Sequence, residues 1–224
     1  MFEELDILFE SATIKPAFDR VHVILALFLF EENEDGIGRY RLGKELLIGT
    51  GTVKSMIKNL KKKLSFITVL SGENVSKGHI LTKRGSEFLK KLKRKFQLVD
   101  AGDLSLLKDI IIKAEGGNSY FCLVRDASDK ISTGIEQRDA AIKIGGFGAT
   151  CLIYNGDDLI FPSQTPSIKV KDQIKVDRDI FEYIFSLLNY KNITLREKDV
   201  ILIGLGENLG KARIAALNAA LTLL

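Results

Sequence analysis

The segment that most constrains the fold spans residues 49–63 and reads GTGTVKSMIKNLKKK. Behind its two glycines, apolar residues recur at spacings of four, three and four, at Val53, Ile57, Leu60 and Leu64. This spacing places them on one face of a helix and leaves the lysines on the other faces. The sequence therefore predicts a helix that starts near Thr52, packs by one face and presents lysines to solvent.

The flanking segments predict a fixed order of elements. A helix has Pro16 in its first turn and ends before Glu34, and a short second helix covers residues 41–48. Behind the lysine-rich helix, residues 66–70 and 79–82 have strand character and flank a polar segment that contains glycine. Gly85 then precedes a helix with an apolar face at Phe88, Leu89, Leu92 and Phe96. The predicted order is helix, helix, helix, hairpin, helix.

Gly49 and Gly51 suit a sharp turn between two helices, where a residue with positive φ is expected. A phosphate-binding P-loop needs a strand before it and a glycine directly before its lysine, and neither precedes Lys54. The segment is therefore interpreted as seating a helix, with Thr50 or Thr52 as its N-cap.

Charge is distributed unevenly along the chain. Residues 41–95 hold 15 Lys and Arg against 3 Asp and Glu, whereas residues 1–40 hold 3 against 9 and residues 100–224 hold 15 against 17. A basic block of this density favours a polyanionic partner. The alternative is a solvated lysine face without a partner.

Residues 13–97 resemble the winged helix-turn-helix domain of DNA-binding regulators. The resemblance rests on two segments: the turn and helix at 48–60, and His79-Ile80-Leu81-Thr82-Lys83-Arg84-Gly85. The whole chain resembles archaeal winged-helix proteins with a C-terminal domain of unassigned function. The resemblance implies that the third helix enters the major groove of duplex DNA and that the hairpin touches the neighbouring backbone. The residues that this predicts at DNA are Thr50, Thr52, Lys54, Ser55, Lys58, Lys61 and Lys77. A departure is Gly49, which stands where a serine usually caps the helix.

The second half predicts an α+β domain built on a small mixed sheet. Strands are expected at 120–124, 150–154, 159–161 and 200–203, and helices at 179–188 and 212–224. The predicted domains are residues 1–97, a linker at 98–104, and residues 105–224.

Two glycine clusters in this half suggest a ligand site. Neither has the spacing of a P-loop or of a dinucleotide-binding fingerprint. Glycine loops at strand ends expose N–H groups that suit a small anionic or polar metabolite, with Arg138 as a charged partner. The predicted set is Arg138, Gly145, Gly146, Gly148, Gly204, Gly206 and Asn208. The alternative is that the glycines only let a helix pack closely on the sheet.

No catalytic, metal or cofactor site is predicted. His22 and His79 lie far from Cys122 and Cys151 in the sequence, so no metal-ligand spacing occurs, and both cysteines are expected to be buried thiols. The apolar run Val21–Phe30 is too short to span a bilayer. The start of the sequence lacks a basic segment typical of a secretory signal, so a cytoplasmic location is expected.

The resemblance and the charge pattern together predict a transcriptional regulator that binds duplex DNA, is not an enzyme, and forms a homodimer. Three hypotheses stay open for the chain: a DNA-binding module with a metabolite sensor, an enzyme using an acid–base pair such as Asp139 and Glu207 that carries an autoregulatory DNA-binding module, or a DNA-binding architectural or assembly protein without a ligand. The acidic residues 1–40 and the apolar closing helix are both candidate dimer surfaces.

Overall fold

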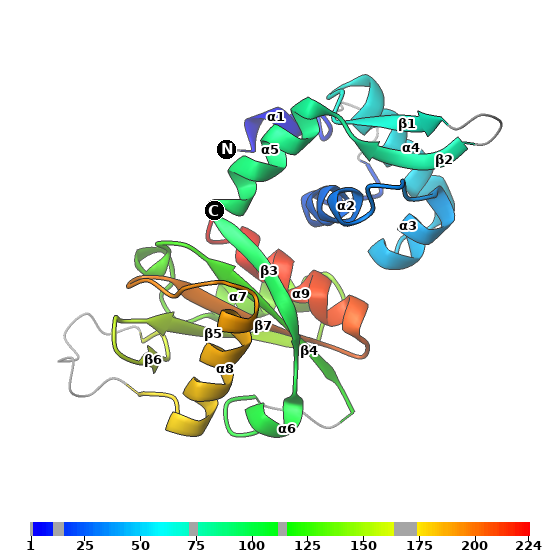
Figure 1. Ribbon diagram of the computed structural model, residues 1–224. Helices are drawn as coiled ribbons and strands as arrows, with labels where there is room; N and C mark the ends of the chain where they lie inside the picture. Colours follow the sequence, from blue (N-terminus) through cyan, green and yellow to red (C-terminus); the bar gives the residue numbers. More distant parts are fainter. Residues whose placement is uncertain (1, 11–15, 72–75, 112–115, 164–173) are drawn as a thin grey trace. The chain divides into compact units, whose positions relative to one another are not determined.

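The computed structural model describes residues 2–10, 16–71, 76–111, 116–163 and 174–224, without the side chains of residues 71, 76 and 77. The chain divides into two compact units, Met1–Leu92 and Lys93–Leu224, named here the N-terminal and C-terminal units. Each unit has its own helices and its own sheet (Figure 1).

The N-terminal unit contains five helices and one antiparallel hairpin within its described residues: α1 (Glu3–Asp6), α2 (Arg20–Glu32), α3 (Arg39–Leu46), α4 (Thr50–Lys62), β1 (Ile67–Ser71), β2 (Ser76–Leu81) and α5 (Lys83–Lys93). From α2 onward this is the order of elements that the sequence predicts.

Helix α2 forms the centre of this unit. Its residues from Val21 to Phe30 are all buried, as expected for a helix that is apolar on every side. His22 lies within this run, and its Nδ1 accepts a hydrogen bond from the Asp19 backbone N–H at 2.9 Å. The predicted first helix is thus confirmed, but it begins at Arg20, so the prediction that Pro16 lies in its first turn is wrong.

The turn between α3 and α4 differs from the prediction. The residue with positive φ is Leu47 (55°), while Gly49 is extended at φ −65° and Gly51 lies inside α4. Gly49 is itself the N-cap and no side chain caps the helix there, so the predicted threonine cap is wrong. Gly43 makes the close contact instead, because a Cβ on it would lie 3.2 Å from both the Ile48 carbonyl oxygen and a Val53 methyl.

The hairpin joins α5 through Thr82. The Thr82 hydroxyl accepts a hydrogen bond from the Gly85 N–H at 3.2 Å and donates one to the Ser65 carbonyl at 2.7 Å. Gly85 allows close packing, since a Cβ on it would lie 2.2 Å from the Phe66 carbonyl oxygen. These contacts fix the start of α5 against the base of β1.

The C-terminal unit is an α+β domain built on a five-stranded sheet. Its described elements are β3 (Phe96–Gly102), α6 (Leu104–Leu107), β4 (Asn118–Val124), the short 3-10 helix η1 (Ser128–Lys130), α7 (Ile135–Lys143), β5 (Gly148–Tyr154), β6 (Leu159–Ile160), α8 (Arg178–Tyr190), β7 (Val200–Gly206) and α9 (Leu209–Leu221). The strand order is β3-β4-β7-β5-β6 (Figure 1). Every neighbouring pair is antiparallel, so the predicted mixed sheet is wrong: β4 and β5 run in the same direction, but β7 lies between them.

The sheet is covered on both faces. Ile201, Ile203 and Leu205 of β7 join a core with Ile180 and Ile184 of α8 on one face. On the other face α9 packs against β7 and β4, and α7 packs against α9 and β5. The apolar side of α9 is buried inside the unit, so the closing helix is not a free dimer surface.

Two boundaries differ from the predictions. Phe96 belongs to β3 rather than to the preceding helix, which ends at Lys93. Most of the predicted linker at 98–104 is also part of β3, which pairs with β4 from Phe96 to Gly102. Burial of Phe96 and Val99 ties this strand into the sheet of the C-terminal unit. Helix α7 was not predicted, because its residues from Arg138 onward were grouped with the glycine cluster that follows them.

Candidate functional site

Helix α4 presents a basic face in the N-terminal unit. Its buried side consists of Val53, Met56, Ile57 and Leu60. Its four lysines are all exposed, no acidic residue occurs along it, and none of the four forms an ion pair within the described chain: Lys54, Lys58, Lys61 and Lys62. This face is the one predicted from the apolar spacing.

Of the other four residues predicted at DNA, three lie in α4 and one in β2. Thr50 and Ser55 are exposed beside the lysines, and Thr52 is half-buried. Gly49 and Gly51 are also exposed, and a Cβ on either would meet no atom within 4 Å. Lys77 lies in β2, but its side chain is outside the described part of the structure.

A groove beside α4 adds residues that the sequence analysis missed. It has a volume of about 590 Å³ and lies between the start of α3, α4 and β2. Arg39 and Lys54 line it, and the guanidinium of Arg39 stands 5.0 Å from the centre of the Tyr40 ring, which is 67% exposed. The signal in the sequence was the Arg-Tyr-Arg triplet at residues 39–41, where the basic block begins.

His79 forms the wall of this groove on β2. Its backbone exchanges two hydrogen bonds with Ile37, at 3.0 and 3.1 Å. Burial lowers the pKa of His79 below its ordinary value, and the charge of Lys61 lowers it further. Burial likewise lowers the pKa of His22, against a smaller opposing effect of the Asp19 carboxylate. Both imidazoles are therefore neutral at pH 7.

Acidification is expected to destabilise the N-terminal unit. Because both folded pKa values lie below the ordinary 6.5, the unfolded state binds more protons as pH falls below that value. The histidine contribution to stability is thus complete above about pH 6.5 and is lost below it. Amide hydrogen exchange of α2 and β2 in the full chain, compared at pH 7.5 and 5 after correction for intrinsic rates, measures this loss. A variant with both His22→Gln and His79→Gln should show a smaller loss, and an N-terminal unit that gains protection at pH 5 would contradict the assignment.

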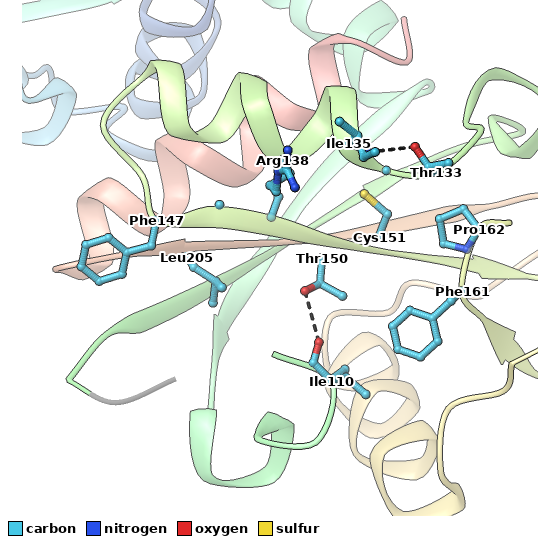
Figure 2. Close-up of a pocket in the computed structure, with 13 residues that line it drawn as sticks. Ile110, Thr133, Ile135, Arg138, Phe147, Thr150, Cys151, Phe161, Pro162 and Leu205 are labelled. Atoms are coloured by element: carbon cyan, nitrogen blue, oxygen red, sulfur yellow. Dashed lines mark hydrogen bonds between the residues drawn. The ribbon is translucent and has the colours of Figure 1, made fainter. Parts of the chain in front are cut away.

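The C-terminal unit contains an open pocket of about 500 Å³ beside β5 (Figure 2). It brings together the start of α7, the first residues of β5 and the chain after β6. The lining residues are Ile110, Thr133, Gly134, Ile135, Arg138, Phe147, Gly148, Ala149, Thr150, Cys151, Phe161, Pro162 and Leu205. The Cγ of Arg138 lies 3.5 Å from the position of a Cβ on Gly148, so these two residues of the predicted ligand set do meet.

The remaining predicted ligand residues do not line this pocket. A Cβ on Gly204 would lie 2.1 Å from the Ala216 N, and one on Gly206 would lie 2.5 Å from the Ala212 N. A Cβ on Gly146 would lie 2.6 Å from the Ala215 Cβ. These three glycines let α9 pack closely on the sheet, which is the alternative considered for the sequence. A Cβ on Gly145 would face open space, at φ 91°.

Asn208 has a local structural role. Its Oδ1 accepts a hydrogen bond from the Lys211 N–H at 3.0 Å and so caps α9. Glu207, next to it, forms an ion pair with Lys211, which lowers the pKa of the Glu207 carboxyl. Asp139 forms an ion pair with Arg138 on α7. Each carboxylate of the acid–base pair considered for an enzyme is therefore matched with a nearby cation, Lys211 for Glu207 and Arg138 for Asp139.

The polar groups in the pocket wall also have partners. Thr150 Oγ1 donates to the Ile110 carbonyl at 3.3 Å, and Thr133 Oγ1 accepts from the Ile135 N–H at 3.4 Å. The Cys151 thiol is buried, as predicted, and burial raises its pKa to about 12. Such a wall offers few unsatisfied groups to a polar metabolite.

Within the described ranges, no cluster of three or more His, Cys, Asp or Glu side chains is placed to hold a metal ion. Among the same residues, no helix combines the length and the apolar character that crossing a membrane requires.

The fold and these surfaces define a class: a two-unit α+β chain whose first unit carries a basic helical face and whose second unit is an antiparallel sheet between helices. Residues 115–223 match the family model of DUF4443, a domain of unknown function. The structure of hypothetical protein PH0730 from Pyrococcus horikoshii OT3 is similar, with a TM-score of 0.63, 24% sequence identity, and coverage of 92% of this chain and 93% of that chain. At this identity the likeness shows the fold alone. No curated protein matches the chain.

Proposed function

We propose that the N-terminal unit is a winged helix-turn-helix module that binds duplex DNA, and that the whole chain is a cytoplasmic transcriptional regulator acting as a homodimer. The observation that carries the proposal is the exposed face of α4, with four lysines and no acidic side chain. A helix packed by one face and basic on the other suits insertion into the major groove. The hairpin after α4 and the exposed Tyr40 beside Arg39 extend the same surface.

The start of α4 supports contacts to phosphate. Gly49, Thr50 and Gly51 are exposed, no side chain caps the helix, and its first N–H groups carry the positive end of the helix dipole. DNA phosphates can approach such a bare helix start closely. Lys54, Lys58 and Lys61 follow on the exposed face behind it.

Affinity of the full chain for duplex DNA is expected to fall steeply with salt. Each lysine–phosphate contact releases condensed counterions, so the logarithm of the binding constant falls by roughly 0.9 per decade of salt for each contact. Lys58→Ala should weaken binding and reduce this slope by about 1. Fluorescence anisotropy with a mixed-sequence duplex, from low to physiological salt, measures both effects.

The matched control is Lys143→Ala, which removes an exposed lysine from α7 of the C-terminal unit and should leave both affinity and slope unchanged. Full-chain protein that binds no duplex at low salt would disprove the proposal. Equal losses of DNA affinity in Lys58→Ala and Lys143→Ala would show that the DNA-binding surface is not the lysine face of α4.

A separate experiment tests whether α4 recognises the base sequence of the duplex. Ser55 is exposed on the same turn as Lys54, so Ser55→Ala should change the preference between duplex sequences by about 1–3 kcal/mol if a base contact is lost. Lys77→Ala, in the hairpin, should weaken binding to all duplex sequences about equally. A selection from randomised duplexes, repeated with each variant, distinguishes these two outcomes.

A further inference from the structure

The wall of the groove beside α4 contains an exposed aromatic residue and a cation next to it. Tyr40 is 67% exposed, although Leu42 and Leu46 of the same helix α3 are buried. The guanidinium of Arg39 lies 5.0 Å from the centre of the Tyr40 ring, and its Nη2 donates to the Tyr40 hydroxyl at 3.3 Å. Aromatic rings and guanidinium planes are the groups on which unpaired bases stack. The pair therefore offers a stacking surface to a base.

The same groove favours a negative charge. Arg39 and Lys54 line it, and within the described ranges neither side chain pairs with a carboxylate. Gly38, the N-cap of α3, is an exposed part of the wall, and no side chain caps the helix there. The first N–H groups of α3 therefore carry the positive end of its helix dipole to the groove. A phosphate group suits this combination of cations and N–H donors.

Two polar atoms of the wall have no partner. Arg39 Nε and His79 Nδ1 are buried, and neither forms a hydrogen bond within the described part of the chain. Because buried polar atoms are nearly always hydrogen-bonded in native structures, this wall suits a ligand with donors and acceptors of its own. Ile57, which is 9% exposed, adds an apolar contact. Aromatic, apolar, cationic and hydrogen-bonding groups together match the parts of a nucleotide.

We propose that the groove beside α4 holds one unpaired nucleotide of the bound DNA, with its base stacked on Tyr40 and its phosphate against Arg39 and Lys54. The groove volume of about 590 Å³ accommodates a base, a sugar and a phosphate. Stacking tolerates any base, so no particular base is required. The inference rests on the duplex binding of the proposed function and specifies the DNA that binds best, a duplex with a single-stranded extension.

DNA is a better source of this nucleotide than a free nucleotide in solution. Lys54 belongs both to the groove and to the exposed face of α4, which continues with Lys58 and Lys61. A strand held by these lysines extends past the groove, whereas a free nucleotide has only the contacts of the groove itself. A base inside a duplex does not fit, because its neighbours cover both of its faces and leave neither to stack on Tyr40.

Fluorescence anisotropy of the full chain tests the proposal with two kinds of duplex that share a central sequence and the number of phosphates. One is blunt, and the other ends in a single-stranded extension of thymidines, prepared with 5′ and with 3′ polarity. Equal phosphate numbers keep the release of counterions comparable. The extended duplex is expected to bind about tenfold more tightly with at least one polarity, which is the size of one stacking contact.

Substitutions identify the stacking residue. Tyr40→Ala should remove the preference for the extended duplex and leave affinity for the blunt duplex within about twofold, whereas Tyr40→Phe should retain the preference, because stacking uses the ring. Tyr190→Ala, at a 79% exposed tyrosine of the C-terminal unit, is the matched control and should retain it. Lys58→Ala should weaken binding to both duplexes alike, since a phosphate contact does not distinguish them.

The outcomes separate this inference from the proposed function. A full chain that binds no duplex disproves both. Equal affinity for blunt and extended duplexes with both polarities, or a Tyr40→Ala protein that keeps the preference, overturns the nucleotide groove and leaves duplex binding by α4 intact. Thymidine monophosphate at the concentration of the protein should leave the preference unchanged. If it abolishes the preference, the groove binds a free nucleotide, and the assignment to DNA is overturned.

Discussion

Replacing Asp199 by alanine is expected to lower the free energy of unfolding of the C-terminal unit by about 3–5 kcal/mol, the range for breaking a buried ion pair on one side. The Asp199 carboxylate is 2% exposed and pairs with Arg125, which is 14% exposed. It also accepts hydrogen bonds from the backbone N–H groups of Asp126 (3.2 Å) and Arg196 (2.9 Å). Its loss leaves a buried guanidinium and two N–H groups without these acceptors.

Urea unfolding followed by tyrosine fluorescence measures this effect. The chain has no tryptophan, and four of its five tyrosines, Tyr120, Tyr154, Tyr183 and Tyr190, lie in the C-terminal unit. The control is Asp129→Ala, which removes an exposed partner of Lys198 and should leave the midpoint unchanged. Similar midpoints for the two variants would show that the buried network contributes no more than a surface pair.

Replacing Gly204 by alanine is expected to destabilise the C-terminal unit by about 3 kcal/mol or more, at or above the upper end of overpacking costs. A Cβ at this position would lie 2.1 Å from the Ala216 N, 2.5 Å from the Ala216 Cα and 2.6 Å from the Ala212 carbonyl oxygen. These are backbone atoms of α9, so no rotamer change relieves the clash. The helix must move away from a strand whose seven residues are all buried.

The same urea titration measures the Gly204 variant, and Gly51→Ala is its matched control. Gly51 is an exposed residue inside α4 with open space around its Cβ position, so alanine there should stabilise the N-terminal unit by about 0.5–1 kcal/mol. Hydrogen exchange of α4 reports that gain. A Gly204→Ala protein as stable as the wild type would show that α9 does not pack as closely as the structure has it.

These two predictions concern residues that the sequence presents very differently. Gly204 and Gly206 stand in a glycine cluster that suggested a ligand loop, and only the position of α9 shows that they are packing residues. Asp199 follows a turn and precedes a strand, and nothing nearby in the sequence marks it as buried. Its partner Arg125 is 74 residues away, so the fold alone brings them together.

Local sequence patterns, by contrast, were sufficient to predict a helix and its buried face where apolar residues recur at helical spacing and turn residues mark the ends. The spacing of Val53, Ile57 and Leu60 determined which face of α4 is buried and which lysines are exposed, because a helix fixes that relation by itself. The apolar run Val21–Phe30 likewise marked the central helix α2. The basic surface of the N-terminal unit could therefore be described from the sequence.

Tertiary structure decided everything that depends on pairing between distant segments. Residues 96–102 have no strong strand signal, and they form β3 because β4 offers its edge to them. The insertion of β7 between β4 and β5 makes every neighbouring pair of strands in the sheet antiparallel. A strand's own sequence fixes which of its side chains point to each face of the sheet, but the neighbouring strands decide which of its peptide groups are hydrogen-bonded. For that reason the sequence was sufficient to mark the basic face of α4, and only the fold showed that Gly204 and Gly206 pack against α9.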